Sequence, residues 1–126
     1  MTVELNHTIV NSTDKRASAR FLAEVLGLPA PQPFGPFHVV QVGRLSLDFA
    51  DAGHVTPQHY AFLVGEDDFD AIFGRICERG LDYWADPFHR RPGAINTDDG
   101  GRGVYWIDPD SHNLEIITRP YGSGQS

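Results

Sequence analysis

The feature that most constrains the fold of this chain is an internal repeat, in which two halves show the same order of local patterns. Each half opens with a strand-like segment that carries a histidine, His7 in the first half and His59 in the second, 52 positions apart. An amphipathic helix pattern follows in each half and ends at a Gly-Leu pair, at residues 27–28 and 80–81. A repeat of a whole supersecondary unit restricts the fold more than any single motif, because each copy must bury an equivalent apolar face.

The spacing of apolar residues predicts the elements of both halves. In the first half these are a strand over 3–10, a helix that begins near 13 and ends near 26, and strands over 37–42 and 45–49. Ser12 or Thr13 is the expected N-cap of this helix. In the second half they are a strand over 58–64 covered on both faces, a helix over 66–80, a short strand over 81–86, and hairpin strands over 104–107 and 114–118. The predicted fold class is therefore α+β, with two tandem βαβββ units.

Composition indicates one ordinary globular domain. The 126 residues suit a single domain, with unit one at about residues 3–50 and unit two at about 58–120. A net charge of −7 with a single lysine argues against a nucleic-acid partner. There is no apolar run of membrane-spanning length and no signal peptide, so we expect no membrane partner and a cytoplasmic location. The only cysteine, Cys77, excludes an internal disulfide, and its place on the apolar stripe of a helix predicts a buried, unreactive thiol.

Four polar side chains interrupt apolar strands at repeat-equivalent positions. Glu115 lies within a run of leucine and isoleucine, and a carboxylate buried there must be paired, hydrogen-bonded or bound to a metal. Asp48 occupies the matching place in the last strand of the first half, and His7 and His59 begin the first strands. A shared centre that holds a metal ion is the simplest account of the four. Asp48 is either a fourth ligand or a hydrogen-bond partner.

Four segments carry a resemblance to a known family. They are Asn-His-Thr-Ile-Val, Ala-Arg-Phe-Leu-Ala-Glu-Val-Leu-Gly-Leu, Gln-His-Tyr-Ala-Phe-Leu-Val and Gly-Val-Tyr-Trp-Ile-Asp-Pro-Asp-Ser-His-Asn-Leu-Glu-Ile. With them the chain resembles the vicinal oxygen chelate superfamily, which includes glyoxalase I, fosfomycin-resistance thiol transferases, extradiol dioxygenases and bleomycin-resistance proteins. The resemblance covers nearly the whole chain.

The resemblance implies a single vicinal oxygen chelate domain, an open, cup-shaped β-sheet with helices on the outside, and a homodimer. It implies that His7, His59 and Glu115 bind a metal, that Glu115 and Tyr105 are catalytic, and that Tyr105 contacts substrate. Asp48 stands where glyoxalase I members place a fourth ligand.

Two histidines and one carboxylate occupy one face of an octahedron and leave positions for substrate, water or O₂. The set suits a divalent ion, Fe, Mn, Ni, Co or Zn. The predicted function is therefore a metal-dependent lyase, thiol transferase or extradiol dioxygenase that acts on a small molecule chelating through its oxygens. The alternative is a binding protein that sequesters an antibiotic or metabolite without catalysis, or an accessory domain with a vestigial cup.

The other chemistry-bearing side chains have a simpler expected role. The remaining histidines are predicted to be surface residues, with His112 serving the turn, and the arginines that border the long loop over 87–101 are predicted to be solvated, the alternative being contact with an anionic substrate. They are His38, His54, His89, His112, Arg90, Arg91 and Arg102.

Overall fold

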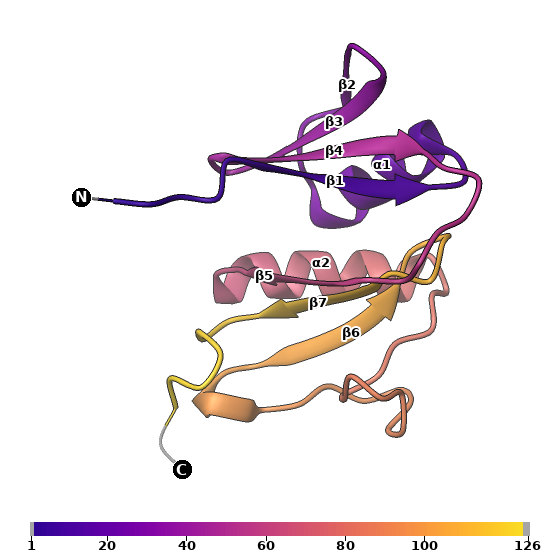
Figure 1. Ribbon diagram of the computed structural model, residues 1–126. Coiled ribbons are helices and arrows are strands. Elements are labelled where there is room, and N and C mark those ends of the chain that lie inside the picture. Colours follow the sequence, from indigo (N-terminus) through magenta and orange to yellow (C-terminus); the bar gives the residue numbers. More distant parts are fainter. Residues whose placement is uncertain (1, 125–126) are drawn as a thin grey trace. The chain divides into compact units, whose positions relative to one another are not determined.

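Two units, Met1–Thr56 and Pro57–Ser126, make up the chain in the computed structural model, which describes residues 2–124 (Figure 1). The positions of the two units relative to each other are not determined, so each is described by itself. Within the described residues, no helix has the length and apolar character that crossing a membrane requires.

The first unit is a four-stranded sheet with one helix. Its elements are β1 (His7–Ser12), α1 (Lys15–Leu26), β2 (Gln32–Phe34), β3 (Phe37–Val42) and β4 (Leu45–Asp51). The strand order is β1-β4-β3-β2, with β1 parallel to β4 and the other pairs antiparallel. Successive side chains point to opposite faces of the sheet. The apolar residues gather on one of these faces, and the sheet contacts α1 through β1, β3 and β4. The buried residues of the apolar face are Val10, Val40, Leu47 and Phe49.

The start of α1 differs from the sequence expectation. Asp14, not Ser12 or Thr13, is the N-cap, and its carboxylate accepts hydrogen bonds from the backbone amides of Arg16 and Ala17. Ser12 is fully buried at the end of β1, where it pairs with β4 and its hydroxyl donates to the Ala50 carbonyl. Pairing with β4 therefore extends β1 through Ser12 and delays the helix.

The second unit repeats the pattern with three strands. Its elements are β5 (His59–Leu63), α2 (Glu66–Glu78), a single 3₁₀ turn η1 (Asp98–Gly100), β6 (Gly103–Ile107) and β7 (Asn113–Ile117). The strand order is β5-β7-β6, with β5 parallel to β7 and β6 antiparallel to it. The core of this unit comes from α2 and one face of the hairpin. Its buried residues include Phe69, Ile72, Ile76, Val104, Trp106, Leu114 and Ile116. Two helices on two open mixed sheets confirm the predicted α+β class.

Three local expectations for the second unit are wrong. Residues 81–86 form no strand, and only Trp84 bridges to Tyr105 and Pro92. β5 is not covered on both faces, since its residues alternate between exposed and half-buried and Leu63 is 60% exposed. Cys77 is exposed. The buried residues of α2 are Phe69, Ile72 and Ile76, and Cys77 lies beside this buried face.

Candidate functional site

The parallel pairing of β5 with β7 brings a histidine and a carboxylate together. His59 lies opposite Asn113 and Ala61 lies opposite Glu115, so the His59 and Glu115 side chains share the sheet face away from the core. His59 Nε2 is 3.1 Å from Glu115 Oε1. Glu115 is 8% exposed, so the predicted buried carboxylate within a strand is confirmed, and its partner is His59.

The other ring nitrogen fixes the tautomer of His59. Its Nδ1 lies 2.9 Å from the backbone carbonyl oxygen of Asn113, which can only accept a hydrogen bond, so Nδ1 carries the hydrogen. Nε2 is then the atom that can bind a metal. A ligating histidine commonly donates its second N–H in this way, which orients the ring and makes it a stronger ligand.

The donor atoms of this pair fit a metal ion. A neutral His59 presents the Nε2 lone pair to a carboxylate oxygen, and two acceptors in contact require a proton or a cation between them. Two ligand atoms each about 2.1 Å from one metal, at right angles, lie about 3 Å apart. The observed 3.1 Å separation agrees with that arrangement.

Tyr105 completes the group from β6. It pairs with Glu115 across the hairpin, and its ring stacks on His59 with the centroids 5.9 Å apart. Burial, together with a hydrogen bond from its hydroxyl to Glu115, raises the pKa of Tyr105 well above its ordinary value. The phenol therefore keeps its proton at neutral pH and acts as a hydrogen-bond donor to the carboxylate.

A loop that the sequence did not single out supports the His59 end of the pair. His89 Nε2 lies 2.9 Å from the side-chain Oδ1 of Asn113, and the His89 ring stacks on Trp84 with centroids 3.9 Å apart. The Asn113 amide also donates to the carbonyl of Pro87. The expectation that His89 is a solvated surface residue is wrong, because Asn113 joins this loop to the strand that orients His59.

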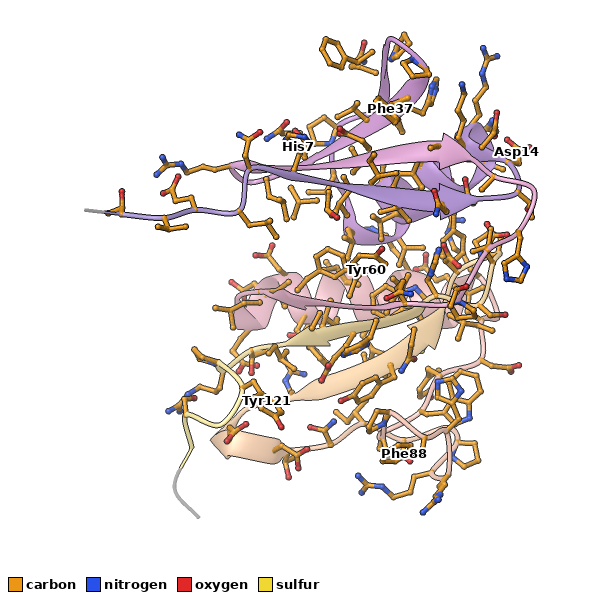
Figure 2. All side chains as sticks on the ribbon, in the orientation of Figure 1. His7, Asp14, Phe37, Tyr60, Phe88 and Tyr121 are labelled. Carbon is orange, nitrogen blue, oxygen red and sulfur yellow. The ribbon has the colours of Figure 1, made fainter. Side chains whose placement is uncertain are left out.

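The turn before His89 is shaped by one carboxylate. Burial alone would raise the pKa of Asp86, but hydrogen bonds from the backbone amides of Arg90, Arg91 and Phe88 lower it. These bonds close the turn and hold His89 at a φ of 58°, in the left-handed region. Phe88 projects from the turn (Figure 2) and is 75% exposed. The Asp-Pro pair at 86–87 is the signal in the sequence that could have indicated this turn.

Two other polar side chains are held by contacts within the second unit, although a surface position was expected for both. His112 is 1% exposed, and its Nδ1 accepts a hydrogen bond from the backbone amide of Gln58. Arg102 pairs with Glu66 and Asp70 and lies over the Phe69 ring. Both residues fix elements of the second unit and lie outside the His59–Glu115 pair.

The first unit holds the remaining predicted residues. His7 and Asp48 line one hollow of about 440 Å³ on the sheet face away from α1. His7 Nδ1 lies 2.7 Å from the side-chain oxygen of Asn6. His7 belongs to the first unit, and His59 and Glu115 belong to the second. Among residues 2–124 it gathers no group of three or more His, Cys, Asp or Glu side chains that could hold a metal. The complete ligand set of His7, His59 and Glu115 stays a prediction.

Comparison with known proteins places the chain in a family. No family model matches the sequence. The glutathione transferase FosA of Serratia marcescens is 31% identical over 124 residues, which cover 92% of this chain and 81% of that protein. The chain therefore belongs to the vicinal oxygen chelate superfamily, which includes glyoxalases and fosfomycin-resistance proteins.

Two solved structures show higher identity. Oxidase ChaP-H1 is 72% identical, with a TM-score of 0.94 over 96% of this chain and 99% of that one. Oxidase ChaP-H2 is 66% identical, with a TM-score of 0.95 over 99% of this chain and all of the other (100%). These relatives favour an enzyme over a sequestering protein. Bleomycin resistance, a homodimer and a cytoplasmic location stay predictions.

Proposed function

We propose that this protein is a metal-dependent oxidase that uses O₂ and acts on a small molecule chelating the metal through neighbouring oxygens. The His59–Glu115 pair carries the proposal, because it holds an imidazole nitrogen 3.1 Å from a carboxylate oxygen, a separation that either a proton or one metal ion can bridge. The identity of 72% with one oxidase and 66% with another favours oxidation over the lyase and thiol-transfer alternatives.

The chain's own residues would perform four tasks. His59 and Glu115, together with His7 of the first unit, would hold the divalent ion. Asn113 would keep the His59 ring in the tautomer that leaves Nε2 free. Tyr105 would hold Glu115 in place through its neutral hydroxyl. Two histidines and one carboxylate leave coordination positions open, so the bound metal would supply the means to activate O₂ beside a chelated substrate.

Elemental analysis of protein purified without chelator tests the metal site. We expect about one divalent metal ion per chain, lost in Glu115→Ala with little change in fold by circular dichroism, since alanine fits an apolar strand. Glu78→Ala, at the exposed end of α2, is the matched control and should retain the metal. Wild-type protein that stays metal-free after soaking in Fe(II), Mn(II) or Zn(II) would contradict the proposal.

Oxygen uptake separates oxidation from thiol transfer. With Fe(II)-loaded protein and catechol as the probe, we expect O₂ consumption that His59→Ala abolishes. Glutathione consumption in the presence of fosfomycin, without O₂ uptake on any chelating phenol, would instead assign the chain the reaction named for its 31%-identical relative.

A further inference from the structure

A hollow in the second unit is lined by the segment 81–93. The backbone amide of Ala85 donates to the carbonyl of Arg91, and that of Gly93 donates to the carbonyl of Tyr83, so the segment folds back on itself as a short hairpin. The hollow has a volume of about 340 Å³, which is within the range of small-molecule sites. The residues that line this hairpin hollow are Leu81, Asp82, Tyr83, Trp84, Pro92 and Gly93.

The hairpin hollow carries one unpaired charge. Asp82 is the only charged residue that lines it among residues 2–124, and its side chain is exposed. In that part of the chain, no hydrogen bond or ion pair engages the Asp82 carboxylate. The proposed metal ligands His59 and Glu115 do not line the hollow, so the charge of Asp82 is available to a separate ligand.

Two aromatic residues follow Asp82, and neighbouring rings hold both of them in place. The Trp84 indole stacks on the His89 ring, with centroids 3.9 Å apart and planes 12° apart. The Tyr83 ring meets the Phe73 ring edge-on, with centroids 5.0 Å apart. Both residues are half-buried, so part of each stays open to the hollow that they line. Side chains that are already fixed lose little conformational entropy when a ligand binds.

This combination of groups favours a cation with apolar substituents. The face of an aromatic ring carries partial negative charge and attracts ammonium groups, quaternary ones included. The Asp82 carboxylate adds a full negative charge and disfavours an anion. Leu81 and Pro92 offer apolar contact to the carbon substituents of such an ion. The net charge of −7 on the chain adds a long-range attraction for cations.

We propose that the hairpin hollow binds a small organic ammonium ion, with the Asp82 carboxylate as its counter-charge and Trp84 and Tyr83 as its aromatic wall. The site is distinct from the His59–Glu115 pair and needs no metal. Its ligand is recognised by positive charge and by apolar substituents together, so neither a neutral isostere nor an inorganic cation satisfies it.

A nitrogen–proton NMR titration at constant ionic strength tests the proposal, with choline as the probe. The chain has two tryptophans, and each gives one indole N–H signal. We expect choline to shift the Trp84 signal in a saturable way. The Trp106 signal should stay in place, because Trp106 is fully buried and does not line the hollow.

Substitutions in the lining test each part of the site. We expect Asp82→Asn to weaken choline binding about two- to fivefold, as loss of an exposed ion pair does. Tyr83→Leu should weaken it about threefold, because it removes a ring and keeps an apolar side chain. Asp67→Asn is the matched control, since it makes the same change of charge at an exposed position at the opposite end of α2 and should bind like wild type.

Two further probes separate the proposed recognition from simpler ones. The neutral isostere 3,3-dimethylbutan-1-ol has the shape of choline without its charge and should bind about fivefold more weakly or worse. Potassium ion has the charge without the apolar substituents and should leave the Trp84 signal in place.

Several results would overturn the inference. They are a Trp84 signal that choline does not move, equal affinity in wild type and Asp82→Asn, or equal responses to choline and either control probe. Loss of fold cannot imitate the expected result, because Asp82 is exposed and the remaining signals of its variant report the fold directly. Metal uptake is measured separately, since none of the lining residues is a proposed metal ligand.

Discussion

At the scale of single residues, burial of charge was the signal that sequence reasoning could use. Glu115 is flanked by apolar residues on its strand, and the structure confirms that it is buried and paired. His89 and His112 gave no such signal, since their burial depends on partners far along the chain, Asn113 and Gln58. Polar residues in loops can be located only when the loop has folded.

The orientation of His59 is the first property that can be tested at this scale. Asn113→Ala removes the side chain that ties the 86–91 loop to the strand, so the carbonyl that holds His59 Nδ1 is less well fixed. We expect metal affinity to fall about tenfold, as is common when a group supporting a ligand is removed. Nitrogen NMR of the metal-free protein should show a less populated Nδ1–H tautomer of His59.

The control for this prediction is His54→Ala, since His54 is an exposed histidine outside the described site. Unchanged metal affinity in Asn113→Ala, with the tautomer preserved, would show that the loop has no influence on the ligand.

Tyr105 gives a pH dependence of stability. Its pKa is raised in the folded state, so folding holds the phenol proton more tightly than the unfolded chain does. The stabilisation is complete below the unfolded value of about 10 and is lost as pH rises above it.

We expect the unfolding midpoint of wild type to fall between pH 10 and 11.5 more steeply than that of Tyr105→Phe, which has no phenol to ionise. Tyr60, whose pKa is also raised, remains in both proteins and contributes equally to both. Parallel midpoint curves would contradict the role given to Tyr105.

At the scale of elements, periodicity located both helices and the final hairpin but misjudged their ends. The predicted N-cap of α1 was wrong because Ser12, although a residue type that often caps helices, pairs with β4 instead, and its hydroxyl donates to Ala50. Residues 81–86 were assigned to a strand on composition, but only Trp84 finds a pairing partner. Such boundaries depend on which neighbouring element a residue joins, and a local sequence pattern carries no information about that choice.

The observed cap can be tested directly. Asp14→Ala leaves the backbone amides of Arg16 and Ala17 without their acceptor, and we expect a loss of about 1 kcal/mol in the free energy of unfolding, or about 3–5 °C in the midpoint. Arg20→Ala, an exposed substitution within α1, is the control and should change the midpoint little. A larger effect from Thr13→Ala than from Asp14→Ala would show that the cap lies one residue earlier.

At the scale of the whole molecule, the repeat predicted the tandem arrangement because each copy carries its own core. The predicted ligand set could not be completed in the same way, since it draws on His7 of one unit and on His59 and Glu115 of the other. Each sheet ends in a strand, β1 or β5, that is paired on one side within its unit. Such edges invite pairing with a further strand.

The predicted homodimer follows from the same edges and from the family resemblance. We expect light scattering coupled to gel filtration to give twice the 14.0 kDa mass of the chain. Ile9→Lys, which puts a charge on the exposed face of the β1 edge, should shift the protein towards the monomer. A monomeric wild type with full metal content would contradict the prediction.

Asp48 and Glu115 occupy equivalent positions in the two repeats but differ in side-chain length by one methylene group. A change of that size is enough to give two repeats different side-chain contacts. The two units also carry a histidine at equivalent positions of their sheets, and among the described residues only the longer Glu115 contacts the histidine of its own unit. In the proposed site Glu115 would hold the metal beside His59, whereas His7 of the first unit is hydrogen-bonded to Asn6 and not to Asp48. The double variant Asp48→Glu with Glu115→Asp would test whether side-chain length alone determines which carboxylate contacts the histidine of its unit.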